Sequence, residues 1–277
     1  MPEGDSIFRA ALTLNRALAG KVVTKFETQL PQLARVDDDS PIAGRTVVSV
    51  ESSGKWMRMH FSGDLTLVTH MLMSGSWHIY RPGERWRLSR QDMRVAIHTA
   101  DYVAVAFRVA VAEFHNAESL RRHSSMRRLG PDVLAADFDE TAAVSRLQAR
   151  PELEAGIAML AQSIVAGLGN VFKSEVCFAS GVNPFRKVAS LTKDEMRSLI
   201  ANARTFMTAS ADTGVRRTTG RSNPSQRLWV YKRADQSCRK CGAIILSRKQ
   251  GLDARITFWC PACQPLYNSS DCHANKE

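Results

Sequence analysis

The feature of this chain that most constrains its fold is a group of four cysteines near its C-terminal end. Cys238 and Cys241 are separated by two residues, as are Cys260 and Cys263, and eighteen residues lie between the two pairs. This spacing suits four thiolates around one tetrahedral zinc ion, in a structural site without an open coordination position. The alternative is two unrelated cysteine pairs. A zinc site predicts a small ribbon whose fold depends on the metal, because so short a segment has little core of its own.

The two remaining cysteines have different surroundings. Cys177 lies in an apolar segment and is expected in a core, whereas Cys272 and the adjacent His273 lie in a polar tail and are not expected to be ligands. The chain shows neither a secretory signal nor an apolar stretch near the roughly 18 residues of a membrane span. We therefore expect a reducing intracellular compartment, where cysteines serve as metal ligands or buried thiols.

The composition is strongly basic. There are 38 lysines and arginines against 27 aspartates and glutamates, a formal charge of +11. Basic side chains that neutralise phosphates release condensed counterions, so such a chain most often binds a polyanion; the alternative is a merely basic surface. Eleven basic residues and two acidic ones lie between Arg216 and Arg255, so we expect polyanion contacts around the cysteine ribbon.

The first half of the chain has the pattern of a β-rich domain. Residues 5–19 predict an amphipathic helix with Asp5 as its N-cap. After it, short segments alternate apolar and polar residues and are separated by turn signals such as Ser62-Gly63-Asp64 and Ala100-Asp101. The expected strands are 22–27, 46–51, 56–61, 66–72, 94–99, 102–107 and 109–114. This pattern predicts a sandwich or barrel with one helix in front.

The second half turns helical after about residue 124. One apolar stripe is formed by Leu153, Ile157, Leu160, Ala161 and Ile164. A capping box at 192–195 starts another helix, with apolar residues on one face. The segment 129–132 is the expected interdomain linker, and 213–227 is an expected basic loop. A polar tail from about residue 266 is expected to be disordered.

Three turns carry side chains suited to DNA. The motif GLGN (167–170) precedes a helix, where glycines allow close backbone approach and free N–H groups bind phosphate; a structural turn between helices is the alternative. Lys55 lies at a turn that enters a strand, as a phosphate contact or an ordinary surface charge. Arg255 follows a turn at Gly251, so it either presents a guanidinium for phosphate or groove contact or is a solvated arginine.

Met73 lies in HMLMSG (70–75), just before an expected turn. Most methionines in such a position are part of a core. A minority act as wedges that enter the base stack of a kinked duplex. The sequence alone leaves both readings of Met73 open.

The chain begins with MPEG, and removal of Met1 would expose Pro2 as a secondary amine. Such an amine can add to an aldehyde-like sugar carbon, and α-amino groups titrate near about 8, so a useful fraction is unprotonated at neutral pH. A neighbouring cation such as Lys55 would lower that value further. Glu3 could protonate a sugar oxygen or shuttle protons. The alternative is that Pro2-Glu3 simply leads into the first helix.

Taken together in order, these motifs resemble one family. MPEG, GKW, HMLMSG, LGPD, QSIVAGLGN and RITFWCPACQ are similar to segments of the formamidopyrimidine-DNA glycosylase/endonuclease VIII family of bacterial base-excision repair enzymes. The resemblance extends from residue 1 to about residue 264. Each motif is weak by itself, but the ordered set is specific.

The resemblance implies an α+β multidomain fold. It would comprise a catalytic β-sandwich with flanking helices over 1–124 and a helical helix–two-turn–helix domain over 125–234. A four-cysteine zinc finger would follow at 235–265, and a disordered tail at 266–277. One structural zinc ion and no organic cofactor are implied. The expected partner is double-stranded DNA with oxidised bases or abasic sites, bound by a cytoplasmic, nucleoid-associated monomer that contacts no membrane.

The resemblance also implies roles for individual residues. Pro2 would be the Schiff-base nucleophile at C1′ and Glu3 the acid/base residue, while Lys55 would contact a phosphate beside the lesion and assist the chemistry. Asn170 and Arg255 would hold the phosphates that flank the flipped nucleotide, with Arg255 part of the catalytic set. In addition, Met73 would fill the gap that the flipped nucleotide leaves. Excision of the base would be followed by β,δ-elimination.

Two details bear on the substrate. MPEGD before an apolar helix resembles the endonuclease VIII branch, which removes oxidised pyrimidines, whereas MLMSGS resembles the 8-oxoguanine branch. Ser6 stands where the family commonly has a glutamate, so any role of that carboxylate is filled otherwise or lost. The loop 213–227 lies where the family varies its base-capping loop, which makes it a candidate for base specificity.

The leading hypothesis is therefore a bifunctional DNA glycosylase/AP lyase for oxidised pyrimidines. A second hypothesis keeps the chemistry but makes 8-oxoguanine or formamidopyrimidine the main substrate. A third, suggested by Ser6, is a non-catalytic binder of damaged DNA.

Overall fold

The computed structural model describes residues 2–266, and the chain divides into two compact units, with the division between Arg128 and Leu129. Each unit has its own hydrophobic core. The expectations for Met1, for the tail after Leu266 and for Cys272 and His273 lie outside the described residues. The finer division of the second unit into a helical domain and a zinc finger stays a prediction.

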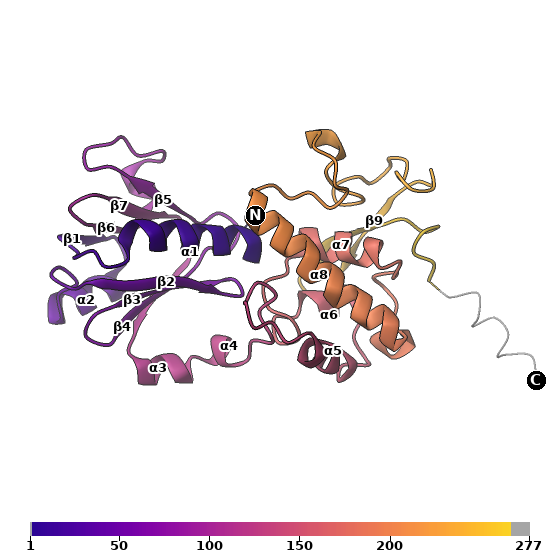
Figure 1. Ribbon diagram of the computed structural model, residues 1–277, viewed down its shortest axis with the longest axis horizontal. Coiled ribbons are helices and arrows are strands. Elements are labelled where there is room, and N and C mark those ends of the chain that lie inside the picture. Colours follow the sequence, from indigo (N-terminus) through magenta and orange to yellow (C-terminus); the bar gives the residue numbers. More distant parts are fainter. Residues whose placement is uncertain (1, 267–277) are drawn as a thin grey trace, which may run out of the picture. The chain divides into compact units, whose positions relative to one another are not determined.

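The first unit is a sandwich of two four-stranded antiparallel sheets, ordered β1-β6-β7-β5 and β2-β3-β4-β8 (Figure 1). The sequence predicted a sandwich or a barrel. Because the strands form two separate sheets, each with its own edge strands, the unit is a sandwich. The strands are β1 (Lys25–Thr28), β2 (Val47–Ser53), β3 (Trp56–Phe61), β4 (Leu65–His70), β5 (Ser76–Tyr80), β6 (Met93–His98), β7 (Val103–Phe107) and β8 (Val111–His115).

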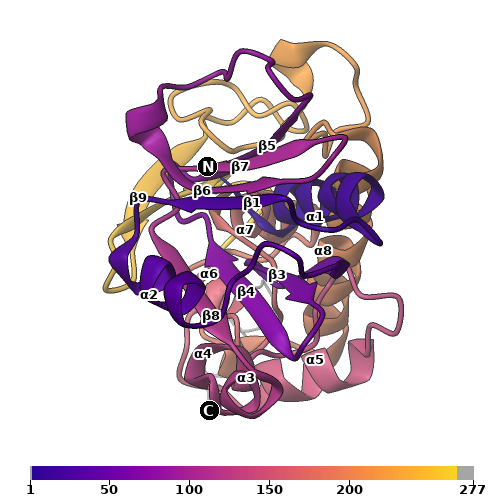
Figure 2. The ribbon, with the colours of Figure 1, turned by 90° about the vertical axis from the view of Figure 1, so that its left-hand side faces the viewer.

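Two helices cover the open edges of the sandwich. The first, α1 (Gly4–Leu18), contacts β2 and β5, and α2 (Pro31–Asp39) contacts β1 and β8 at the opposite edges (Figure 2). The buried face of α1, which includes Ile7 and Leu14, therefore joins the core between the sheets. Two short helices, α3 (Ala117–Arg122) and α4 (Ser124–Arg127), end the unit.

The structure corrects the predicted start of the first helix. The N-cap is Glu3, with an extended backbone, and Asp5 lies inside the first turn, where it is buried. The prediction favoured Asp5 because aspartate is a preferred cap residue. The actual start is closed by Ser6, whose side chain bonds to the backbone of Glu3. Glu3 is consequently part of the helix boundary rather than outside it.

Among the elements of the first unit that were not predicted are a helix and a strand of the sandwich. Helix α2 is nine residues long and mostly polar, with Leu33 as its one buried residue, and β5 spans five residues directly after the turn of HMLMSG. The predicted turns at Ser62-Gly63-Asp64 and Ala100-Asp101 are confirmed between β3 and β4 and between β6 and β7.

The second unit has a helical core and a smaller hydrophobic cluster beside the hairpin β9–β10. Helix α7 packs against α6 and α8, and α8 also packs against α5. The predicted capping box at Thr192 and Glu195 is confirmed at the start of α8. The elements are α5 (Glu140–Gln148), α6 (Ala155–Leu160), α7 (Asn170–Ala179), α8 (Lys193–Thr213), β9 (Leu246–Gln250) and β10 (Arg255–Trp259).

The apolar stripe from Leu153 to Ile164 does not form one helix. Helix α6 ends at Leu160, and the chain then turns around the amide of Gln162. This amide donates to the carbonyls of Leu160 and Leu168 and accepts from the N–H of Gly167 at 3.0 Å. A polar side chain thus holds an irregular segment that apolar periodicity suggested to be helical.

The expected linker 129–132 is bound into the second unit. The N–H of Gly130 donates to Gln162, and the Pro131 carbonyl accepts from Ala166. A side chain at Gly130 would meet the Ile164 carbonyl oxygen at 2.4 Å, so only glycine fits there. Among residues 2–266, no helix is long and apolar enough to cross a membrane.

Candidate functional site

The N-terminal residues form a compact turn at the start of α1. Pro2 is half-buried, and the Glu3 side chain is fully buried at 0% exposure. The Ser6 hydroxyl accepts from the Glu3 N–H at 3.1 Å and donates to the Glu3 carbonyl at 2.9 Å. The backbone of Glu3 is therefore fixed from both sides, and with it the direction of the preceding Pro2 nitrogen.

Lys55 lies at the level of this turn. The Asn15 side chain accepts from the Val50 N–H at 2.8 Å, and Gly20 binds the Val47 carbonyl, so α1 and β2 run in opposite directions. From this anchor the helix rises about 18 Å back to Glu3, and β2 extends about 17 Å to the turn at Lys55. The sandwich thus brings the predicted nucleophile, carboxylate and lysine to one end.

A neutral histidine adjoins this lysine. His70 pairs with Trp56 across β3 and β4, and their rings meet edge to face with centroids 4.7 Å apart. Burial lowers the pKa of His70, and the positive charge of Lys55 lowers it further. The Leu72 N–H donates to His70 Nδ1 at 3.1 Å, which fixes the neutral ring. This end of the sandwich therefore has no second cation at His70 near neutral pH.

The turn after β4 presents apolar side chains to solvent. Met71 is buried in the core, whereas Leu72 is 48% and Met73 59% exposed. Leu72 has a positive φ of 47°, and the Gly75 N–H binds the Met71 carbonyl at 2.8 Å. The reading of Met73 as a core residue is thus wrong for this structure, and its exposure suits a wedge. Leu72, which was not singled out, shares the exposed position.

In the second unit, Asn170 begins α7 after the glycine turn. Gly167 has φ of +106°, which L side chains rarely adopt, and Gly169 is the N-cap. The Asn170 side chain is 8% exposed and donates to the Ile256 carbonyl on β10 at 2.8 Å. The predicted residues Asn170 and Arg255 are therefore neighbours, since Ile256 directly follows Arg255. The Oδ1 atom of Asn170 has no hydrogen-bond partner among the described residues.

A buried polar chain fixes the hairpin that carries Arg255. Lys173 of α7 is fully buried and donates to the Thr257 hydroxyl at 2.5 Å. Thr257 donates to Gln250, which in turn donates to Glu154 at 2.7 Å. These bonds join β9 and β10 to the helices. These bonds were not predicted from the sequence, although a lysine among the apolar residues of α7 was a usable signal.

Glu175 of α7 anchors both ends of the basic loop 213–227. Its carboxylate accepts from the backbone N–H groups of Trp229, Val230 and Tyr231 at 2.8 to 2.9 Å and from the hydroxyl of Thr218. Burial raises the pKa of this carboxyl, and the four donors oppose that effect. The loop 213–227, which is predicted to cap the flipped nucleobase, is therefore held in place by one buried side chain, that of Glu175.

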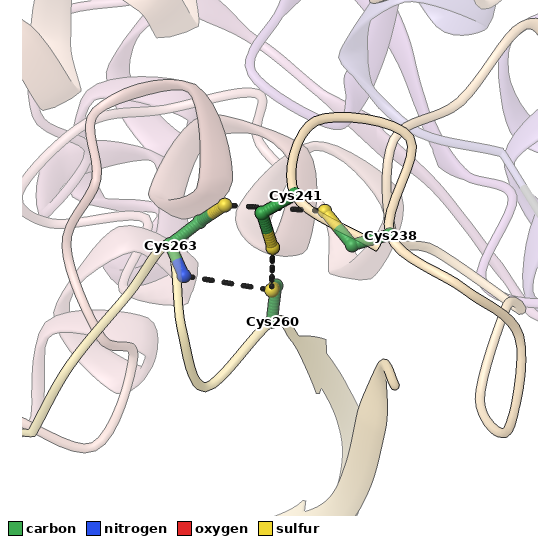
Figure 3. Close-up of side chains that lie close together, drawn as sticks. All are labelled: Cys238, Cys241, Cys260 and Cys263. Atoms are coloured by element: carbon green, nitrogen blue, oxygen red, sulfur yellow. Dashed lines mark hydrogen bonds between the residues drawn. The ribbon is translucent and has the colours of Figure 1, made fainter. Parts of the chain in front are cut away.

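The four predicted metal ligands come together (Figure 3). Sγ atoms of Cys241 and Cys260 are 3.5 Å apart, those of Cys238 and Cys263 are 3.9 Å apart, and all four lie within 4.8 Å of one another. Tetrahedral zinc with Zn–S bonds of about 2.3 Å separates its sulfurs by about 3.8 Å. All described cysteines are free thiols, and backbone N–H groups of Lys240 and Cys263 point at the sulfurs. The cluster can hold a metal ion.

Cys177 lies elsewhere, fully buried in the helical core, where burial raises its pKa to about 12. This placement confirms the expectation that Cys177 is a core residue.

Part of the basic segment 216–255 serves the fold. Arg233 is 8% exposed and donates to the Ser237 carbonyl, and Arg239 donates to the Leu228 carbonyl. Arg248 stacks over the ring of Phe185 at 3.8 Å. These arginines hold loops and the hairpin together, so the charge of this segment overstates the number of groups left for phosphate.

Comparison with known proteins gives the family. Residues 1–130 match the formamidopyrimidine-DNA glycosylase N-terminal domain, and residues 129–222 match the formamidopyrimidine-DNA glycosylase H2TH domain. A probable endonuclease 8 2 of Streptomyces coelicolor is 40% identical over 95% of this chain and 94% of its own. A protein of Mycolicibacterium smegmatis named DNA-(apurinic or apyrimidinic site) lyase Nei2 is 34% identical over 95% and 99%.

A solved structure supports the fold. Formamidopyrimidine-DNA glycosylase of Lactococcus lactis, bound to DNA with an AP site, superposes with a TM-score of 0.81 at 20% identity, over 95% of this chain and all of that one. The fold class is thereby confirmed: a β-sandwich, an H2TH domain and a C-terminal four-cysteine cluster. The chain belongs to the formamidopyrimidine-DNA glycosylase/endonuclease VIII family, close to its endonuclease VIII members.

Proposed function

We propose that this protein is a bifunctional DNA glycosylase/AP lyase that removes oxidised pyrimidines from double-stranded DNA in the bacterial cytoplasm. What supports the proposal is the end of the sandwich where α1 begins with Pro2 and the buried Glu3, and towards which the antiparallel strand β2 runs to the turn at Lys55. The names of the relatives support it, since they are called endonuclease 8 and an AP-site lyase. The family membership supplies the reaction class.

The chemistry begins at the Pro2 nitrogen once Met1 is removed. Its lone pair forms a bond to C1′ of the damaged nucleotide as the C1′–base bond breaks and the base leaves with a proton. Glu3 then donates a proton to O4′ as the C1′–O4′ bond opens, which gives an iminium. Loss of a C2′ proton expels the 3′ phosphate, and a second elimination expels the 5′ phosphate.

The remaining residues hold the DNA. Lys55 contacts a phosphate beside the lesion, and Arg255 and Asn170 contact the phosphates that flank the flipped nucleotide. The exposed Met73 enters the stack in its place, helped by Leu72. A damaged base costs least to unpair, which favours its extrusion over that of a normal base.

The four-cysteine cluster binds one structural zinc ion. The donor set of four thiolates and their mutual spacing support zinc over harder metals. The ion supplies fold energy to the segment that ends in β10 and so positions Arg255. No organic cofactor is needed, and the protein acts as a monomer.

Borohydride trapping tests the proposal. Reduction of the iminium should couple the protein covalently to duplexes with thymine glycol or dihydrouracil. The matched control is the same chain with one extra residue before Pro2, which turns the amine into an amide and should give no adduct. Trapping that favours 8-oxoguanine duplexes would support the second hypothesis for the substrate. Tight binding to an abasic-site analogue without any nicking would support the non-catalytic binder.

A further inference from the structure

Three side chains near the C-terminal end of the first unit bring potential metal-ligand atoms close together. Nε2 of His115 lies 3.1 Å from Oε2 of Glu113, and Nε2 of His123 lies 3.6 Å from the same oxygen. All three ligand atoms are within 4.8 Å of one another. The two imidazoles are largely buried, whereas Glu113 is half-exposed. Glu113 and His115 belong to β8, and His123 lies between α3 and α4.

The contacts of His115 hold its ring with Nε2 toward the carboxylate. Nδ1 lies 3.3 Å from the Ser119 hydroxyl oxygen, which is itself held by the Asn116 backbone, with the carbonyl at 3.2 Å and the N–H at 3.0 Å. Nε2 of this ring therefore faces Oε2 of Glu113, and the contact at Nδ1 orients the ring as the outer partner of a metal-binding histidine does.

Two other histidine–glutamate pairs of this unit have a lysine or arginine beside the carboxylate. Glu51, which binds His60, also pairs with Arg58 at 2.9 Å. Glu27, which binds His98, also pairs with Lys25 at 3.3 Å. Within residues 2–266, the ion-pair partners of Glu113 are the two histidines and no lysine or arginine.

We propose that Glu113, His115 and His123 form a second metal site, for a divalent transition ion of the zinc type. Two imidazoles and one carboxylate are a common zinc donor set, and bonds of about 2.0–2.1 Å separate tetrahedral ligand atoms by about 3.4 Å. The separations of 3.1 and 3.6 Å bracket that value. Magnesium and calcium prefer oxygen ligands throughout and do not fit. The half-exposed carboxylate leaves the fourth position to water.

Occupation of this site has a local structural consequence. Nδ1 of His123 accepts from the Met126 N–H at 3.3 Å and so caps α4. A neutral imidazole that binds metal through Nε2 carries hydrogen on Nδ1, which cannot accept from Met126. The ion therefore releases this cap and ties His123 to β8 instead. Metal binding thus replaces the cap of α4 by a link between His123 and β8. This exchange takes place in the last turn before Leu129, where the second unit begins.

Zinc counting on the full chain tests the site. The protein is dialysed against micromolar buffered Zn2+, and bound zinc is measured by mass spectrometry. Wild type should hold two ions per chain, one of them in the cysteine cluster. Glu113→Gln and His123→Asn should hold one. Asparagine is itself a preferred N-cap, so this substitution keeps α4 capped while it removes the ligand.

The control and the second readout make the outcome unambiguous. His60→Gln alters a histidine–glutamate pair that Arg58 already neutralises, so it should keep two ions. Zinc should also speed hydrogen exchange at the Met126 amide in wild type and leave it unchanged in His123→Asn. One ion in wild type, or a second ion that persists in both ligand variants, would overturn the proposal.

Discussion

The Ser6 hydroxyl closes the first turn of α1 on Glu3: it accepts from the Glu3 N–H at 3.1 Å and donates to the Glu3 carbonyl at 2.9 Å. The resemblance to the family implies a glutamate at this position, where this chain has a serine. Its visible task is to fix the backbone that joins the proposed nucleophile to the proposed acid. The departure from the family pattern thus has a structural use in this chain.

Removal of that hydroxyl should weaken the first unit slightly. Ser6→Ala leaves the Glu3 N–H without its side-chain partner, and loss of such a capping interaction costs about 1 kcal/mol. Urea unfolding should show this loss. Thr13→Ala is the control, because its exposed hydroxyl only bonds back to the Arg9 carbonyl within α1. Equal stability of Ser6→Ala and wild type would show that the bonds contribute nothing.

The charge of Lys55 should be readable at His70. Burial and this charge lower the pKa of His70, so NMR titration of the ring should give a midpoint below 6.5. Lys55→Met should move the midpoint upward, and Lys25→Met should not. Because the folded state disfavours protonated His70, the unfolded chain binds that proton more readily. The stability contributed by neutral His70 is therefore lost as the pH falls from 6.5 through the lowered pKa.

Glu175 should be essential for order in the loop 213–227. In Glu175→Gln one carboxylate oxygen becomes an NH2 group that faces N–H donors, so buried donors lose their acceptor at a cost of about 3 kcal/mol. Glu152→Gln changes an exposed side chain and should stay within about 0.5 kcal/mol of wild type. Unfolding curves check both, and limited proteolysis of the Glu175→Gln variant should cut first within 213–227. A stable, protease-resistant Glu175→Gln would contradict this anchoring.

Arg255 should contribute one phosphate contact. Arg255→Ala should weaken binding to an abasic duplex and reduce the slope of log K against log salt by about 0.9. Lys249 lies on the neighbouring strand β9 and pairs with Ile256 in the hairpin register, so Lys249→Ala is the matched charge control. An unchanged slope in Arg255→Ala would place this arginine outside the DNA contact.

The sequence predicted those parts of the fold that depend on local pattern. Alternation identified seven strands, and the capping box at Thr192 marked the start of α8 correctly. The sequence pattern gave wrong helix boundaries where a single polar side chain overrides the local periodicity. Gln162 bends an apolar stripe out of the helix, and Ser6 moves the N-cap from Asp5 to Glu3.

The residues of the candidate site also divide into those that local sequence pattern predicted and those that it did not. The cysteine spacing led directly to the metal cluster, since ligand spacing is a local property. The neighbourhood of Asn170 and Arg255 was implied only by the resemblance, because their bond joins α7 to a hairpin far along the chain. Lys173 and Glu175 were missed because partners that fix their side chains lie far along the chain, on β10 and around Trp229.

The central claim is that the Pro2 nitrogen forms the covalent bond to DNA. The most direct measurement is to trap the protein on thymine glycol DNA with borohydride, digest the adduct and locate the linked residue by mass spectrometry. The account predicts that the DNA remnant lies on the N-terminal peptide, on Pro2, with Met1 absent. A remnant on a lysine, or a trapped peptide that still carries Met1, would contradict it.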